Sequence, residues 1–558
     1  MERWGRERRE RRSQAICNFV VPAFMSSSRK IRDAYKSWAI AGLLAALLVA
    51  GVAVAQQPPA TKAPPSKTPR VESNTPDKQG SEAKPEHLVT EQEAKELFRS
   101  VDRILKFDST ETGLPIRHEV KRQLVNRDQV QAYINHRIDE DEDVQRMQRS
   151  ERVLKKFGLL PRDFNMRSFF VTLLREQVAG YYDAKTKTVN LLNWVEPAVQ
   201  EPVLAHELTH ALQDQSFDLE RWMKQSTTAT EVKPSSDATR KGESKKQNSK
   251  NEEGKKTDDV QEVQSDEGEA ARLAVVEGQA MLVLVDYMLA PTGQSVATSP
   301  GVVDAIKQGM MAGDNSPVFN RAPLYLKESL TFAYRYGLDF EREVLAKKGK
   351  EAAYAGTFTH PPHSEREIME PAAYLSNEKM PALPIPDFDV MVQDGHQKFD
   401  IGSFGEFDVS VFIEQFGGTD SSDRLTPGWR GGYYYAAQRK SESNGPLAMV
   451  YVSRWASPED AQEFAAVYSA SVKKRYMRAD PVETPKRLIA VSYPPKGQGG
   501  AAQDDDDNDE ANPTQWMTEE GRVIVEPHGD LVLVMESFDQ RSADKLRDAV
   551  LAADKPHQ

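Results

Sequence analysis

Two histidines and a glutamate within five residues form the clearest chemical signal in the chain. His206-Glu207-Leu208-Thr209-His210 is an H-E-x-x-H motif. On a helix, residues four apart lie on one face, about 40° from each other, so both imidazoles can reach one metal ion. Glu207, next to the first histidine, would lie close enough to hold a water at that ion. The motif therefore predicts a divalent metal centre with Glu207 as the catalytic base.

The stretch around the motif has the periodicity of a helix that is anchored in a core. Gln200–Gln215 is expected to be this helix, and a strand is expected just before it at Thr188–Trp194. The apolar residues that would anchor the helix are Val203, Leu204, Leu208, Ala211 and Leu212. The alternative is that both histidines lie on the helix surface beside an incidental glutamate. A strand followed by this helix favours the metal site.

A zinc site of this kind needs a third protein ligand and leaves one position open for water. A longer motif, with glycine three and histidine six residues after His210, is excluded because Gln213 and Ser216 stand there. Asp214 and Asp218 are acidic and close in sequence, but they belong to no supporting motif.

The strongest candidate for the third ligand is Glu277, in the apolar helix expected at Asp266–Leu289. The residues that share its helical face are Ala270, Leu273, Ala280, Met281 and Leu284. The polar residues expected away from that face are Arg272, Gln279 and Asp286. An unpaired carboxylate on an apolar stripe would be very costly to bury, so Glu277 needs a cation or is neutralised by a proton.

Two alternatives to Glu277 as a ligand stay open. A buried Arg or Lys could supply the positive charge in a structural salt bridge. Glu269, near the helix start, is a weaker ligand candidate, because carboxylates are common there for dipole reasons. Gly278, beside Glu277, fits close packing against the helix at Gln200–Gln215.

Four stretches of the chain resemble a group of exported bacterial metallopeptidases. They are Arg175–Asp183 (REQVAGYYD), His206–Gln215 (HELTHALQDQ), Val276-Glu277-Gly278 and Pro361–Met369 (PPHSEREIM). An H-E-x-x-H motif followed by a glutamate on a later helix also looks like the gluzincin branch of zinc metallopeptidases.

The resemblance covers roughly residues 86–374. It implies one Zn²⁺ ion bound by His206, His210 and Glu277, with Glu207 as general base, and hydrolysis of peptide bonds in a protein or peptide substrate. The sequence departs from the group in one place, because Glu370-Pro371 stands where His-Pro usually follows. That departure leaves the role of the preceding segment open.

The composition excludes several other classes of protein. Of 558 residues, 73 are Lys or Arg and 85 are Asp or Glu, a net charge of −12 with no basic bias toward nucleic acid. The single cysteine, Cys17, excludes an intrachain disulfide and a cysteine-built zinc site.

An apolar segment near the N-terminus predicts export. Trp38–Ala55 follows four basic residues and ends in Ala-Val-Ala, the pattern of a signal peptide cleaved after Ala55. Met25 is the expected start of translation. We therefore expect a periplasmic or secreted protein, whereas an uncleaved segment would anchor it in the membrane. No other segment is expected to contact a membrane.

Composition also divides the chain into parts. These are an N-terminal extension with the signal peptide (1–55), a Pro-rich disordered linker (56–85), a zincin-like domain (86–390) with a disordered insertion (225–265), and a C-terminal α+β domain (400–558). The acidic stretch Pro495–Pro513 is expected to be a solvated loop, since it lacks the ligand spacing of a calcium site.

The expected fold class is α+β, with a mainly helical, zincin-like catalytic domain, a short edge strand and a smaller α+β domain. Further helices are expected around 97–105, 154–160, 169–177, 322–347, 457–468 and 541–552, and further strands at 432–439, 447–455, 522–527 and 531–537. The strand at Thr188–Trp194 is expected to pair with an extended substrate along its free edge. Conceivable oxyanion stabilisers are Tyr181, Tyr182, His360 and His363, with none preferred.

A second class of function stays open: a non-catalytic, zinc-stabilised binding or scaffold protein of the cell envelope. It would act through the C-terminal domain. The aromatic residues Trp429, Tyr433, Tyr434 and Tyr435 could serve there as core or as a contact surface.

Overall fold

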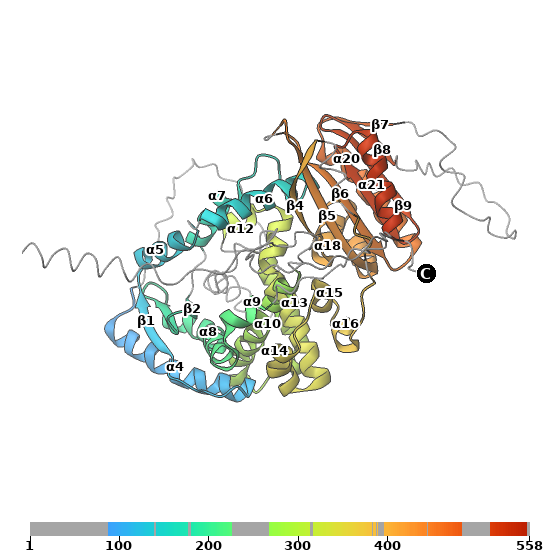
Figure 1. Cartoon of the computed structure of the whole chain (residues 1–558). Helices are drawn as coiled ribbons and strands as arrows, with labels where there is room; N and C mark the ends of the chain where they lie inside the picture. The colour runs from blue at the N-terminus through green and yellow to red at the C-terminus, as the bar shows by residue number, and fades with distance from the viewer. Residues whose placement is uncertain are drawn as a thin grey trace, which may run out of the picture.

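A computed structural model describes residues 88–138, 141–176, 180–225, 267–312, 316–381, 383–386, 388, 395–442, 445–482 and 514–554. The expected signal peptide, the linker 56–85, the insertion after Gln225 and the acidic stretch up to Pro513 lie outside these residues. The described chain has a mixed α+β architecture, as predicted. A mainly helical half lies at one end, and a half built on a large sheet lies at the other (Figure 1).

Four long helices form the frame of the helical half: α4 (Glu91–Thr112), α8 (Pro197–Phe217), α10 (Glu267–Leu289) and α13 (Leu324–Lys348). Shorter helices surround them: α5 (Arg127–Ile138), α6 (Asp141–Phe157), α7 (Met166–Glu176), α9 (Leu219–Lys224), α11 (Pro300–Ala312), α12 (Pro317–Asn320), α14 (Thr357–Thr359), α15 (Glu365–Met369) and α16 (Pro371–Ser376). Two 3₁₀ turns, η2 (Ala290–Thr292) and η3 (Val296–Thr298), and a π-helical turn, η4 (Ala352–Gly356), complete this half.

Helix α10 is the centre of this half, and it is buried around its whole circumference. It packs against α8, α13, α4 and α15. The expected polar face is therefore wrong: Gln279 is fully buried, and Arg272 lies over the ring of Trp222 at 4.3 Å from its centroid. Four neighbours leave no side of the helix for water.

Length and apolar composition alone would also allow α10 to cross a membrane, which the sequence prediction overlooked. Of the described residues, only Glu267–Thr292 passes that test, and 72% of its apolar window is buried inside the protein. Its burial accounts for its composition, because a helix surrounded by other helices is apolar on all sides.

Gly278 lies at the closest approach of two helices, but not the two that were expected. A Cβ atom at Gly278 would lie 2.2 Å from the carbonyl oxygen of Gly337 on α13, and one at Gly337 would lie 2.2 Å from that of Ala274. The two glycines therefore bring the backbones of α10 and α13 together. The expected close packing of Gly278 against α8 is wrong.

A three-stranded sheet lies beside α8, and it corrects the prediction of a free edge. Its strands are β1 (Lys121–Val125), β2 (Tyr181–Asp183) and β3 (Thr188–Leu192), in the order β1-β3-β2. Strand β3 is parallel to β1 and antiparallel to β2, so both of its edges are paired. The expected edge strand is thus the central strand. Its two partners are too short, or too polar, to stand out in a periodicity search.

The C-terminal half is a seven-stranded antiparallel sheet with helices on both faces. Its strands, in the order β4-β5-β6-β10-β9-β8-β7, are β4 (His396–Ser403), β5 (Trp429–Arg439), β6 (Ala448–Trp455), β7 (Ala479–Pro481), β8 (Gln515–Thr518), β9 (Gly521–His528) and β10 (Leu531–Glu536). The other elements are α18 (Glu406–Gly417), α19 (Thr419–Leu425), η5 (Thr426–Gly428), α20 (Pro458–Arg475) and α21 (Gln540–Ala553). The four strands and two helices expected here are confirmed.

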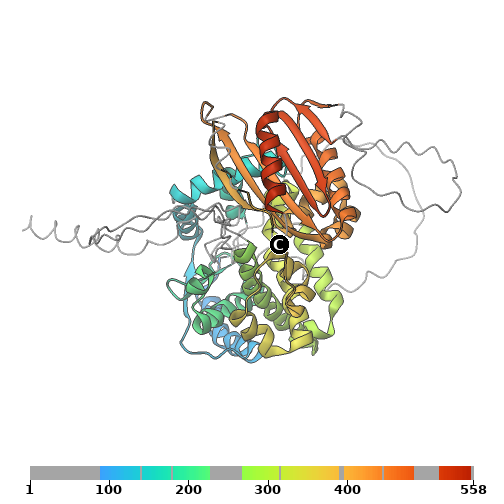
Figure 2. The ribbon, with the colours of Figure 1, turned by 45° about the vertical axis from the view of Figure 1, so that its right-hand side comes forward.

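The two faces of this sheet bury alternate side chains of each strand. Helices cover the sheet on both sides (Figure 2). Tyr434 belongs to the core cluster with α18 and α20, whereas Tyr433 and Tyr435 belong to the cluster with α21. Trp429 is also buried. The aromatic cluster is therefore core and not a contact surface.

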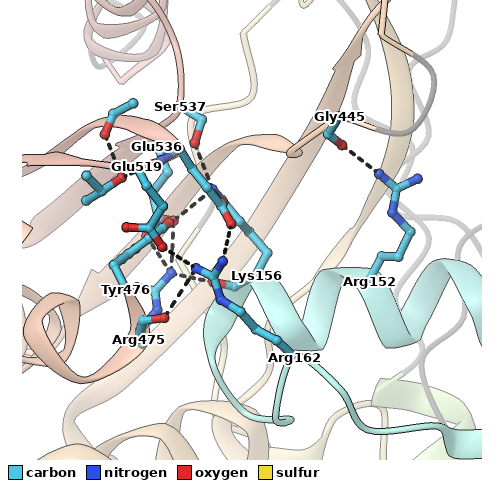
Figure 3. Close-up of polar contacts among 12 residues, drawn as sticks. Arg152, Lys156, Arg162, Gly445, Arg475, Tyr476, Glu519, Glu536 and Ser537 are labelled. Carbon is cyan, nitrogen blue, oxygen red and sulfur yellow. Dashed lines mark hydrogen bonds and ion pairs between the residues drawn. The ribbon is translucent and has the colours of Figure 1, made fainter. Parts of the chain in front are cut away.

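The end of α6 joins the helical half to the sheet. Phe157 stacks on Phe404 with ring centroids 4.1 Å apart, and both lie in one continuous hydrophobic core that spans the two halves. Beside them, Lys156 Nζ lies 2.8 Å from Glu520 and 3.6 Å from Glu536, whose carboxylate also accepts hydrogen bonds from Arg475 (Figure 3). The two halves are held together by apolar packing and by buried charge.

The segment at Pro361–Met369 forms a second joint between the halves. Glu365 is fully buried and accepts a hydrogen bond from the backbone N–H of Phe407, in the first turn of α18, at 3.2 Å. The Arg366 guanidinium lies 3.2 Å from Glu406 and 3.0 Å from Glu378. The role of this segment, left open by the sequence, is to fasten the helical half to the sheet.

Replacing Glu536 by glutamine is expected to destabilise the chain by about 3–5 kcal/mol, because Arg475 would stay buried without its carboxylate and Lys156 would keep only Glu520. Burial works to raise the pKa of Glu536, but Arg475 and Lys156 hold it below its usual value of 4.5. The stabilisation is therefore present above about pH 4.5 and is lost as the pH falls through the lower folded-state pKa. Chemical denaturation at a series of pH values measures both effects.

The matched control is Glu463→Gln, which removes a carboxylate from an exposed pair with Arg424. It should change the free energy of unfolding by about 1 kcal/mol or less. Equal effects of the two substitutions would contradict the role given to the buried joint.

Candidate metal centre

Helices α8 and α10 bring three metal-binding side chains together. His206 Nε2 and Glu277 Oε2 lie 3.1 Å apart, His210 Nε2 and Glu277 Oε2 lie 3.4 Å apart, and the two Nε2 atoms are separated by 3.1 Å. Among the described residues, this is the one group of three or more His, Cys, Asp or Glu residues whose ligand atoms all lie within 4.8 Å of one another. The three residues that the sequence predicted as ligands therefore share one point in space.

Local sequence explains why these helices present the three residues inward. In α8, every residue from Val203 to Asp214 is buried, so both histidines are carried into the core by apolar neighbours. Pro197 begins the helix at a position where a missing N–H is tolerated. In α10, the buried surface continues through Glu277, which is fully enclosed. The histidines are not surface residues, and that alternative is wrong.

The other candidate ligands are engaged elsewhere. The Asp214 carboxylate accepts hydrogen bonds from the Tyr182 hydroxyl at 2.8 Å and from Lys187 Nζ at 2.6 Å. Asp218 caps helix α9. Glu269 is not part of the three-residue group. Within the described residues, Glu277 forms ion pairs only with the two imidazoles, so a structural salt bridge to Arg or Lys is not its role.

Mutual electrostatics sets the protonation of the three ligands. Burial would raise the pKa of Glu277, but His210 and His206 lower it to about 2. Burial would lower the pKa of His210, but the charges of Glu277 and Glu207 raise it to about 9. Burial lowers the pKa of His206. A proton on His210 therefore supplies the positive charge beside the Glu277 carboxylate.

We expect zinc binding near neutral pH to release about one proton, because the cation must displace the one held on His210. Zinc affinity should then increase as the pH rises toward about 9, the pKa of His210. Titration calorimetry in buffers with different enthalpies of ionisation measures the number of protons released. A binding enthalpy that is the same in every buffer would contradict this expectation.

Glu207 lies beside the three ligands but is not one of them. Its Oε2 accepts a hydrogen bond from the backbone N–H of Tyr182 at 2.7 Å, while its buried Oε1 has no hydrogen-bond partner among the residues that the structure describes. Burial raises its pKa to about 7, and the bond from Tyr182 partly opposes this effect. A carboxylate with one fixed and one open oxygen, and a pKa near neutrality, has the properties of a general base.

Two glutamines beside the centre were missed as functional residues. His210 Nδ1 lies 2.9 Å from Gln213 Oε1, and Gln213 Nε2 lies 3.0 Å from Gln279 Oε1. Both glutamines are fully buried. Gln213, one helical turn after His210, was visible in the sequence as a polar residue on the histidine face. Gln279 gave no such signal, because its helix was expected to be amphipathic.

The conceivable oxyanion stabilisers do not gather at the centre. The Tyr182 hydroxyl is bonded to Asp214, and Tyr181 stacks on Tyr133. His360 and His363 lie in an exposed segment, where His360 Nδ1 is 3.1 Å from the hydroxyl of Thr359. Another aromatic residue, Tyr334, lies near the centre. The centroid of its ring is 6.2 Å from that of the His206 ring.

Comparison with known proteins identifies only the C-terminal half. Residues 397–547 match a family model described as a domain of unknown function (DUF8575). A search of curated proteins and a search of solved structures each found no match. The matched residues cover nearly all of the large sheet and its helices and contain none of the three ligands. These comparisons therefore do not bear on the chemistry of the centre.

Proposed function

We propose that this chain is a zinc-dependent peptidase of the gluzincin type, exported from the cell, with a zincin-like helical half. The convergence of His206, His210 and Glu277 from two helices carries the proposal, together with Glu207 beside them. Two imidazoles and one carboxylate are a ligand set that catalytic zinc sites use, and they leave a position for water.

The buried oxygen atoms of the donor set fit a cation. Glu277 Oε1 is buried and has no hydrogen-bond partner within the described part of the chain, so this carboxylate has unused capacity to bind a cation. His206 and His210 would hold the ion through Nε2, and Glu277 through its carboxylate. When bound, zinc would supply Lewis-acid chemistry that lowers the pKa of a water and polarises a peptide carbonyl.

Glu207 performs the proton transfers in the proposed reaction. Tyr182 N–H holds one carboxylate oxygen, so the other is oriented to take the proton of an attacking water. The same carboxyl then donates the proton to the leaving nitrogen. Only the ionised form of Glu207 can begin this cycle, so hydrolysis should fall as the pH drops below about 7, the pKa of Glu207. A bound cation would move this midpoint lower, since it favours the carboxylate.

Replacing Glu207 by glutamine tests the proposal. We expect the variant to keep zinc at the wild-type stoichiometry and to lose peptide hydrolysis by about 100-fold to 10,000-fold, the usual contribution of a general base. Metal analysis and hydrolysis of casein and peptide mixtures measure the two properties. Absence of zinc from the wild type, or full activity in the variant, would overturn the proposal.

Burial of the centre favours a second candidate, a binding or scaffold protein that uses zinc to hold its helices together. His206, Glu207 and Glu277 are each at most 1% exposed, and His210 is 3% exposed. Closed zinc sites are typical of structural metal. Glu207→Gln separates the candidates, because a scaffold would keep its stability and its partner. Deleting residues 400–558 would not separate the two candidates, because the two halves share one hydrophobic core and the remaining half would lose part of it.

A further inference from the structure

A chain of buried hydrogen bonds runs from His210 to a π-helical turn on the far side of α10. His210 Nδ1 is 2.9 Å from Gln213 Oε1, and Gln213 Nε2 is 3.0 Å from Gln279 Oε1. Gln279 Nε2 is then 2.7 Å from the carbonyl oxygen of Ala353. Four groups from three segments of the chain are thereby connected without exposure to water.

The backbone carbonyls at this chain determine which way each amide points. The carbonyl of Ala353 can only accept, so the NH₂ group of Gln279 must face it. The carbonyl of Val276 likewise requires the NH₂ group of Gln213, at 3.1 Å. The amide oxygen of Gln279 therefore faces the NH₂ group of Gln213, and the amide oxygen of Gln213 faces His210 Nδ1.

An oxygen facing His210 Nδ1 requires a hydrogen on that nitrogen. We propose that Gln213 and Gln279 are positioning residues that hold His210 with its proton on Nδ1, so that Nε2 is the nitrogen available to zinc. The inference rests on the proposed metal centre. A second hydrogen-bond partner commonly fixes the ring and tautomer of a metal-binding histidine.

The π-helical turn provides a fixed end for this chain. Ala353 lies in η4, and its carbonyl also accepts a hydrogen bond from the Thr357 hydroxyl at 2.7 Å. Because that hydroxyl donates to Ala353, it is free to accept the second N–H of Gln279, at 3.0 Å. Gln279 Nε2 also lies 3.5 Å from Glu341 Oε1, so its NH₂ group faces acceptor oxygens of Ala353, Thr357 and Glu341. A substitution of Gln279 should disturb His210 although the two residues are not in contact.

The test compares zinc affinity in four variants by competition with a chromophoric chelator. Gln213→Leu removes the acceptor and should weaken zinc binding by about 10-fold to 100-fold. Gln213→Glu keeps an acceptor for His210 but loses the donor to Val276 and Gln279, so it should recover part of the affinity that Gln213→Leu loses. Gln279→Leu should have an intermediate effect. The matched control is Gln215→Leu, on the same helix. Within the described residues, its side chain bonds to the backbone of Arg117 and His118, so this variant should not change affinity.

The tautomer itself is read from the long-range ¹H–¹⁵N spectrum of the chain labelled in histidine. The wild type should show His210 bound to zinc through Nε2 with a proton on Nδ1. Zinc affinity in Gln213→Leu equal to that of Gln215→Leu, an equal loss in folded Gln213→Glu, or zinc on Nδ1 would each overturn the inference.

The same spectrum separates this inference from the proposed function. Recorded without metal, at a pH where the ring is neutral, it should still show the proton on Nδ1 in the wild type and a mixture of tautomers in Gln213→Leu. A protein with this pattern that binds no zinc or hydrolyses no peptide would overturn the proposed function alone.

Discussion

Replacing Glu277 by glutamine should abolish tight zinc binding. The carboxylate is one of three residues that could hold the ion, so its loss leaves two imidazoles of that group. The measurement is the melting temperature with and without zinc. Zinc should raise it in the wild type and leave it unchanged in the variant, because only a bound ligand stabilises the folded state.

Glu269→Gln is the matched control for this prediction. It removes a carboxylate from the first turn of the same helix, outside the three-residue group. Its response to zinc should equal that of the wild type. A wild-type response in Glu277→Gln would show that another group completes the site, and the proposed ligand set would then be wrong.

Replacing Gly278 by alanine should destabilise the chain by about 3 kcal/mol or more, since a Cβ atom would lie 2.2 Å from the Gly337 carbonyl oxygen. Backbone cannot rotate away as a side chain can, so α10 must move from α13. Glu277 is the preceding residue, so this movement should also weaken zinc binding. Chemical denaturation and zinc titration measure the two effects.

Gly301→Ala is the control for a change of glycine to alanine in a helix. A Cβ atom there meets no described atom within 4 Å, so the variant should be at least as stable as the wild type. A Gly278→Ala protein as stable as Gly301→Ala would contradict the close approach of α10 and α13.

Local pattern in the sequence was enough to predict the longest helices and the central strands of the large sheet. The helices at Gln200–Gln215 and Asp266–Leu289 and the strands from 432 onward are where periodicity indicated them. The spacing of His206 and His210 was also sufficient to place both imidazoles at one point. These properties depend on residues within one or two turns of each other, so the sequence carries them directly.

Partners between distant segments could not be predicted in the same way. Strand β3 was identified correctly, but its place in the centre of a sheet depends on two short strands that periodicity does not reveal. Gly278 was recognised as a contact point, yet its neighbour is α13 and not α8. In both cases the sequence indicates that a surface is buried without indicating what buries it.

The sequence by itself determined the spacing of the two imidazoles, the neighbouring carboxylate and the need of a buried Glu277 for a cation or a proton. Tertiary structure alone decided that Glu277, 71 residues from His206, meets both rings, and that Gln279 is buried beside them. It also decided that the large sheet is joined to the helical half through Lys156 and Arg366. The physical reason is that side-chain spacing is a local property of a helix, whereas the approach of two helices depends on every surface packed around them.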